Sequence, residues 1–201
     1  MANTKDLAIV QGKTFSLAIR WEAPPIIYKA ITAITQTAPV KITAVGHGIP
    51  DGWRVAVTNV KGMTDINATA NSVKDGDYVQ ATVVDVDTIT LNDINAAGFK
   101  AYISGGYLQY NTPVVLTDFT ARMSIKDKVG GTVLLSLTTE NGGIVIDVTR
   151  HVITLNISAT ASAALTWSKG VYDLELVSAD TIPVVTALLT GKVTVSKEVT
   201  T

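Results

Sequence analysis

The sequence of 201 residues contains no cysteine, few aromatic residues and little charge. Without cysteine, neither a disulfide framework nor a thiolate metal site can form. Aromatic residues make up 6% of the chain and charged residues 16%, with 16 Lys+Arg against 17 Asp+Glu. This balance provides no basic field to bind a nucleic-acid backbone or an anionic membrane surface. We therefore expect neither nucleic acid nor membrane as a partner.

Long apolar runs are also missing from the chain. The longest nearly apolar stretches, such as residues 182–189, have the length of a strand. They fall far below the roughly 20 residues that a membrane helix needs. The first seven residues lack the apolar stretch of a secretory signal. We expect a soluble protein that is made in the cytoplasm.

What the chain does contain is alternation of β-branched and small polar residues, which is typical of half-buried strands. The expected strands cover residues 15–22, 40–45, 54–60, 78–85, 88–91, 106–109, 118–126, 132–136, 144–147, 151–157, 170–177 and 186–195. Short strands at this spacing predict an all-β fold, a sandwich or small barrel rather than parallel βαβ units. One short helix is expected over residues 158–165, because the capping residue Ser158 precedes an Ala-rich segment.

Two proline-containing segments predict the domain organisation. Ala23-Pro24-Pro25 is expected to end the first long strand, because proline cannot donate a hydrogen bond to a sheet. Asn111-Thr112-Pro113 interrupts the pattern again. We therefore predict a discontinuous β-sandwich of residues 1–28 and 113–201, with a small β-barrel of residues 29–112 inserted into it. Such an insertion is tolerated because the entropy cost of loop closure grows slowly with loop length.

Groups able to exchange protons near neutral pH are scarce. Of the two histidines, His47 lies in a predicted turn and His151 opens a predicted strand, and neither has a second histidine at zinc-ligand spacing. Gly12-Lys13-Thr14 lacks the earlier glycine of a phosphate-binding loop. The paired carboxylates Asp75/Asp77 and Asp85/Asp87 are typical of plain turns and lack the further ligands of a calcium loop. We predict no catalytic residue, no metal site and no cofactor, and hence no enzyme.

A few large aromatic residues are the candidates for contact with a partner or a glycan. Each has two interpretations: packing in a core, where aromatics dominate burial, or a platform for a sugar or a protein. Trp53 follows Gly52 and Trp167 follows the Ala-rich segment, while three tyrosines gather near the end of the insert. The candidates are Trp53, Tyr102, Tyr107, Tyr110 and Trp167.

The insert resembles a known protein module in the order of its sequence motifs. Gly46-His47-Gly48 lies in the first of its motif segments, which are residues 42–52, 57–67, 82–91 and 101–106. Over about 65 residues (42–106) they resemble the small β-barrel that phage tail proteins share with the first catalytic-half barrel of ubiquitin-activating enzymes. The barrel is an accessory element in those enzymes, so the resemblance implies a fold and not adenylation chemistry. Residues 68–80 depart from the pattern, because they are polar and predict a longer hairpin.

The flanks resemble the sandwich domain at the start of baseplate and tail-fibre-attachment proteins of bacteriophages. The matching segments are residues 9–15, 116–125, 141–144, 153–158, 170–176 and 188–200. The resemblance implies a non-catalytic structural protein of the virion, in a phage tail or baseplate, that docks tail or fibre components. It implies other tail proteins and copies of itself as partners, in a trimer or hexameric ring, with assembly in the host bacterial cytoplasm. The alternatives are a carbohydrate-binding receptor-contact module of a tail fibre, and a head decoration or collar protein.

Overall fold

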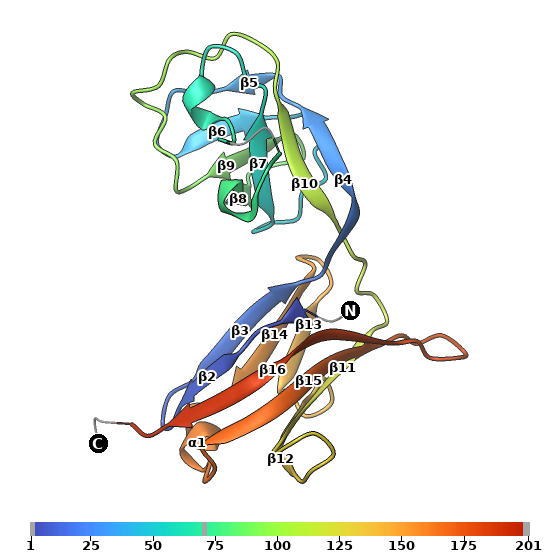
Figure 1. The fold of residues 1–201 in the computed structure, drawn as a ribbon. Coiled ribbons are helices and arrows are strands. Elements are labelled where there is room, and N and C mark those ends of the chain that lie inside the picture. Colours follow the sequence, from blue (N-terminus) through green and yellow to red (C-terminus); the bar gives the residue numbers. More distant parts are fainter. Residues whose placement is uncertain (1–2, 70–71, 199–201) are drawn as a thin grey trace. The chain divides into compact units, whose positions relative to one another are not determined.

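The computed structural model describes residues 3–69 and 72–198. Over these residues the fold is all-β, as the alternation of the sequence predicts (Figure 1). The chain forms two compact units. Unit 1 combines the segment up to Trp21 with the segment from Val115 onward, and unit 2 runs from Glu22 to Val114.

Unit 1 contains a large and a small β-sheet. The order in the large sheet is β1–β16–β15–β11–β12, and β2 also pairs with β16. Its strands are β1 (Asn3–Thr4), β2 (Leu7–Val10), β11 (Thr120–Lys126), β12 (Val133–Thr138), β15 (Lys169–Val177) and β16 (Val185–Ser196). The small sheet has the order β13–β14–β3, with β3 (Phe15–Arg20), β13 (Ile144–Asp147) and β14 (Val152–Ile157).

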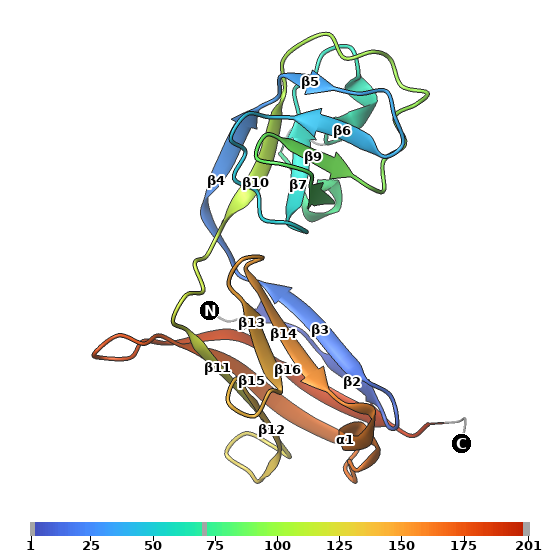
Figure 2. The same cartoon turned by 180° about the vertical axis from the view of Figure 1, so that it is seen from behind.

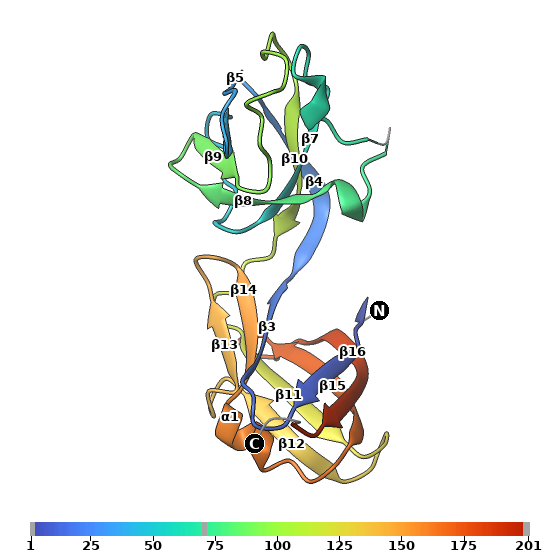
Figure 3. The ribbon, with the colours of Figure 1, turned by 90° about the vertical axis from the view of Figure 1, so that its left-hand side faces the viewer.

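The two sheets of unit 1 lie face to face as a β-sandwich (Figure 3). Ile153 and Leu155 of the small sheet share one hydrophobic core with Leu174 and Leu176 of the large sheet. The short helix α1 (Ala159–Ala163) follows β14, and its N-terminus is capped by the Ser158 hydroxyl, which accepts a hydrogen bond from the Ala161 N–H at 3.1 Å. Both the helix and its cap confirm the prediction made from the Ala-rich segment.

Unit 2 contains one curled sheet that forms a half-barrel around its own core (Figure 2). The strand order is β4–β10–β7–β8–β9–β6–β5, so the path is open at β4 and β5. The strands are β4 (Glu22–Ala30), β5 (Ala33–Ile34), β6 (Val40–Thr43), β7 (Arg54–Thr58), β8 (Val79–Val83), β9 (Thr88–Leu91) and β10 (Tyr107–Pro113). The connection from β7 to β8 contains two 3₁₀ turns, η1 (Thr64–Ile66) and η2 (Asp75–Asp77).

The proline pair does not have the predicted effect. Strand β3 ends at Arg20, but Pro24 and Pro25 lie inside the next strand, β4. In the β4–β10 ladder, Asn111 pairs with Ile26 and the next residue, Thr112, pairs with Ala23. The two prolines between Ala23 and Ile26 therefore have no partner on β10. The missing N–H groups of proline therefore cost no ladder hydrogen bond. Because β4 pairs with β10 as far as Pro113, residues 22–28 and 113–114 belong to unit 2 and not to the sandwich.

Candidate functional site

Two of the five candidate contact residues lie in the core of unit 2. Trp53 is fully buried, and its indole Nε1–H donates to the carbonyl oxygen of Asn111 at 3.0 Å. Tyr110 is 1% exposed, and its hydroxyl donates to the carbonyl oxygen of His47. Burial with a satisfied polar group is the usual arrangement of core aromatics. Neither ring can stack on a partner at the surface, so the interpretation as core residues is confirmed for Trp53 and Tyr110 and their interpretation as contact residues is wrong.

Tyr102 and Trp167 are partly buried against the cores of their units. The Tyr102 hydroxyl lies 3.0 Å from the carbonyl oxygens of both Ile31 and Gly105, so it ties the start of the insert to its end. Trp167 packs against the core of unit 1, and its buried Nε1–H has no hydrogen-bond partner among the described residues. Both side chains are used mainly for packing.

Tyr107 is the candidate that the structure places on the surface. It is 44% exposed and contacts Tyr28, which is 55% exposed, in an edge-to-face pair with ring centroids 6.4 Å apart. Tyr28 pairs with Gln109 across the β4–β10 ladder, and Tyr107 lies two residues before Gln109 on the same face of β10. The sequence interpretation missed Tyr28, although the alternation of Ile26 and Tyr28 with Ile27 marks an outward face.

This outer face forms one wall of a groove of about 530 Å³, here called the tyrosine groove. Ile26 and Tyr28 of β4, Gln109 of β10 and Thr58 of β7 line it. Tyr78 and parts of the β7–β8 connection, residues 59, 67–69 and 72–73, complete the lining. Every described residue that lines the groove is uncharged at neutral pH.

A charged network contacts Tyr78, one of the residues that line the tyrosine groove. The guanidinium of Arg54 donates to both carboxylate oxygens of Glu22, at 2.6 and 2.7 Å, and to Asp75 at 3.1 Å. The hydrogen bond to Glu22 is the main cause that raises the pKa of Arg54, and the bond to Asp75 adds to it. Partial burial acts in the opposite direction and lowers the pKa. Arg54 also lies 4.9 Å from the centre of the Tyr78 ring, a cation–π contact. The network therefore fixes Tyr78 against the sheet.

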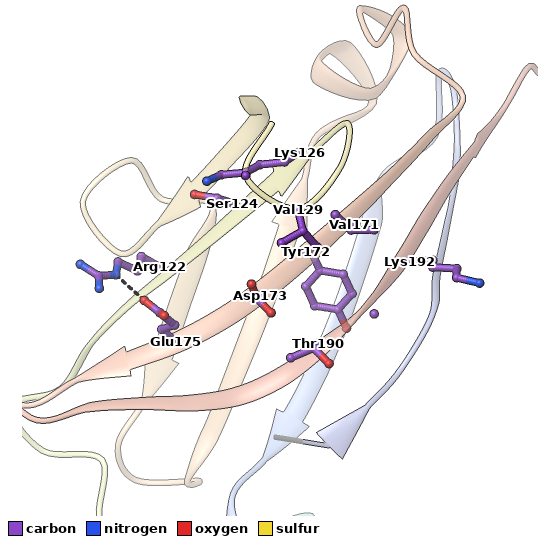
Figure 4. A pocket seen from close by; sticks show the side chains of 12 residues that line it. Arg122, Ser124, Lys126, Val129, Val171, Tyr172, Asp173, Glu175, Thr190 and Lys192 are labelled. Atoms are coloured by element: carbon purple, nitrogen blue, oxygen red, sulfur yellow. Dashed lines mark hydrogen bonds and ion pairs between the residues drawn. The ribbon is translucent and has the colours of Figure 1, made fainter. Parts of the chain in front are cut away.

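The large sheet of unit 1 carries a second groove on its outer face, of about 810 Å³ (Figure 4). Its charged side chains come from β11, β15 and β16 and have both signs: Arg122, Lys126, Asp173, Glu175 and Lys192. Arg122 donates to Glu175 at 2.8 Å, and their side chains are 57% and 32% exposed. An ion pair exposed to this extent is screened by water and contributes little to stability.

Tyr172 lies at the same groove but belongs to the core of unit 1. It is 3% exposed, and its hydroxyl donates to the carbonyl oxygen of Lys5 at 2.7 Å. Burial, followed by the nearby carboxylates of Asp6 and Asp173, raises the pKa of Tyr172 to about 12. Each of these causes disfavours the phenolate, so the side chain acts as a neutral hydrogen-bond donor.

The β15–β16 hairpin of unit 1 presents apolar side chains at its end, and its tip projects beyond the sheet (Figure 1). Ile182 is 84% exposed, Val184 58% and Val185 47%. The Val184 N–H donates to the Ser178 hydroxyl at 2.9 Å, and the Ser178 N–H donates to the Val184 carbonyl at 3.0 Å. We call residues 178–185 the hairpin tip. These two hydrogen bonds close the base of the hairpin tip, and its apolar side chains lie in solvent.

His47 and the carboxylate pair Asp85/Asp87 hold turns in unit 2. His47 is 2% exposed, and its Nδ1 accepts a hydrogen bond from the Ile49 N–H at 2.9 Å. Its Nε2 therefore carries the proton and lies 3.0 Å from the Asp85 carbonyl oxygen. Asp87 accepts from the Gly46 N–H, and Asp85 accepts from the Asp87 N–H, which lowers the pKa of Asp85. These side chains satisfy backbone donors.

The second carboxylate pair acts in the same way around η2. Asp77 accepts hydrogen bonds from the Lys74 N–H at 2.9 Å and from the Thr69 N–H at 3.1 Å, and these bonds lower its pKa. Its partner in the sequence, Asp75, instead binds Arg54. Over residues 3–69 and 72–198, no group of three or more His, Asp or Glu side chains is placed to hold a metal ion.

In the part of the chain that the structure describes, no helix has the length and apolar character needed to cross a membrane. No protein-family model matches the chain, and no curated protein matches it either.

Proposed function

We propose that this chain is a non-catalytic structural protein of a bacteriophage tail or baseplate, which docks other tail proteins and copies of itself. The observation that carries the proposal is the hairpin tip, because Ile182, Val184 and Val185 stand in solvent on an ordered turn. Single exposed apolar residues are common on protein surfaces, but three within four residues on a projecting hairpin are typical of a contact site. The assignment to a phage is supported separately, by the order of sequence motifs in the two flanks and in the insert.

The hairpin tip suits docking for a physical reason. Two hydrogen bonds between Ser178 and Val184 close its base, which reduces the conformational entropy that the tip loses when it enters a partner. Burial of Ile182 and Val184 removes apolar surface from water, which drives association without charge pairing. A chain with a formal net charge of −1 can also pack beside many copies of itself with little repulsion. A ring of three or six copies is the assembly that we expect.

An experiment on assembling particles tests this proposal. The phage that encodes the chain is propagated with the double variant Ile182→Asp/Val184→Asp, and gradient-purified particles are assayed for the chain by immunoblot. We expect incorporation to fall about tenfold or more, because two carboxylates cannot be buried in an apolar contact. Val129→Asp, at a residue that is 91% exposed on another turn of unit 1, is the matched control and should leave incorporation unchanged.

Three outcomes decide between the proposal and its alternatives. Normal incorporation of the double variant would show that the hairpin tip is not the docking surface. Recovery of the chain with tailless heads would favour a head decoration or collar protein. Absence of the wild-type chain from all particles, together with a reaction that the purified chain catalyses, would overturn the structural role.

A further inference from the structure

The tyrosine groove of unit 2 is a formed concave site that the docking role does not use. Its volume of about 530 Å³ lies within the roughly 300–1,000 Å³ typical of sites for compact organic ligands. One wall is the regular outer face of β4, β10 and β7, where Tyr28, Gln109 and Thr58 sit on neighbouring strands. A wall built on paired strands holds its side chains more precisely than a loop does.

The aromatic side chains of the groove are positioned before any ligand arrives. Tyr28 packs edge-to-face with Tyr107, with the ring planes 89° apart. Tyr78 is held on one side by Arg54 and at its hydroxyl by the Gln109 side-chain amide, which donates to it at 3.2 Å. Because the Tyr78 hydroxyl accepts this hydrogen bond, its own proton remains available to a ligand.

The lining chemistry restricts the class of ligand. No described lining residue carries a charge, so a phosphate or a nucleic-acid backbone finds no cationic partner there. The nearby guanidinium of Arg54 is already bound by Glu22 and Asp75. A purely apolar ligand would offer no partner to the Thr58 hydroxyl or to the proton of the Tyr78 hydroxyl. The ligand should therefore be uncharged and rich in hydroxyl groups, with an apolar face.

We infer that the tyrosine groove binds an uncharged oligosaccharide. A hexose ring presents C–H groups on one face and hydroxyls at its rim, which match the exposed ring of Tyr28 and the surrounding amide and hydroxyl side chains. The size of the groove fits a short oligosaccharide. The inference stands on the groove alone and does not depend on the assignment of the chain to a phage tail.

A binding experiment with the full chain tests the inference. The labelled protein is applied to an array of neutral hexose and N-acetylhexosamine oligosaccharides, with sialylated and sulfated oligosaccharides on the same array. The best neutral binder is then titrated against wild type, Tyr28→Ala, Tyr78→Phe and Val86→Ala. We expect about tenfold weaker binding for Tyr28→Ala and a several-fold loss for Tyr78→Phe. Val86→Ala, at a residue 73% exposed and outside the groove, is the control and should bind like wild type.

Thermal unfolding of each variant separates a loss of binding from a loss of fold. Tyr28 is 55% exposed, so we expect Tyr28→Ala to remain folded. Failure of every neutral oligosaccharide to bind would overturn the inference. So would binding that Tyr28→Ala leaves unchanged, or retention of charged oligosaccharides alone. Self-association of the chain that Tyr28→Ala abolishes would instead identify the groove as an interface between copies.

Discussion

At the scale of single residues, tyrosines on one strand take different roles according to the face on which they lie. Tyr107 and Tyr110 are three residues apart on β10, and an odd spacing on a strand places side chains on opposite faces. Tyr107 consequently lies on the outer face of the sheet with Gln109, of which only 7% is exposed, whereas Tyr110 lies in the core with Leu108. The period-two pattern could have separated these tyrosines in the sequence. For Trp53 the period-two pattern does not choose between core and surface, because the residues that bury it come from strands distant in the sequence and its Nε1–H donates to Asn111.

The raised pKa of Tyr172 makes unit 1 sensitive to alkali. Its pKa of about 12 in the folded protein exceeds the usual value of 10, so the folded state keeps a proton that the unfolded chain releases. This contribution to stability is fully present below pH 10 and is lost as the pH rises from about 10 to about 12. We predict that Tyr172→Phe unfolds with a weaker pH dependence in this range. Urea unfolding between pH 7 and pH 11 measures it.

The same variant has a cost near neutral pH. Loss of the hydrogen bond from the Tyr172 hydroxyl to the Lys5 carbonyl should lower the free energy of unfolding by about 1 kcal/mol at pH 7. An unchanged alkaline slope in Tyr172→Phe would show that another group, such as Tyr110 with its pKa raised by burial, dominates the titration.

At the scale of elements, most strands could be predicted because alternation and turn residues act locally. Predicted strands over residues 88–91 and 144–147 coincide with β9 and β13, and the Ala-rich segment forms α1. Strand β4 was missed because two prolines normally end a ladder. A register shift between Asn111 and Thr112 of β10 lets the ladder pass the two prolines. No local sequence pattern predicts this shift.

The candidate sites were harder to predict than the strands because each depends on pairing between distant segments. The tyrosine groove combines residues of β4, β7 and β10 with the β7–β8 connection. Tyr28 and Gln109 lie side by side only through the β4–β10 register. The hairpin tip is a local element, and its apolar residues 182–185 are visible in the sequence. Their exposure, however, arises because the β15–β16 hairpin extends past the rest of the sheet, which only the fold shows.

At the scale of the whole molecule, each unit has a hydrophobic core of its own. We predict that residues 22–114 fold when expressed alone. We also predict that unit 1 folds when Trp21 and Val115 are joined by a short Gly-Ser linker, because the core of the sandwich draws on residues on both sides of the insert. Each product should show a cooperative thermal transition and dispersed amide resonances. An insoluble unit 1 beside a stable full chain would contradict the division.

The proposed role requires many identical contacts, so the number of copies in a particle is the central quantity. Quantitative mass spectrometry of gradient-purified phage particles, calibrated against isotope-labelled peptides of the chain, measures this number most directly. We expect a fixed count that is a multiple of three or six and is confined to particles with tails. A count that varies between preparations, or the absence of the chain from purified particles, would contradict it.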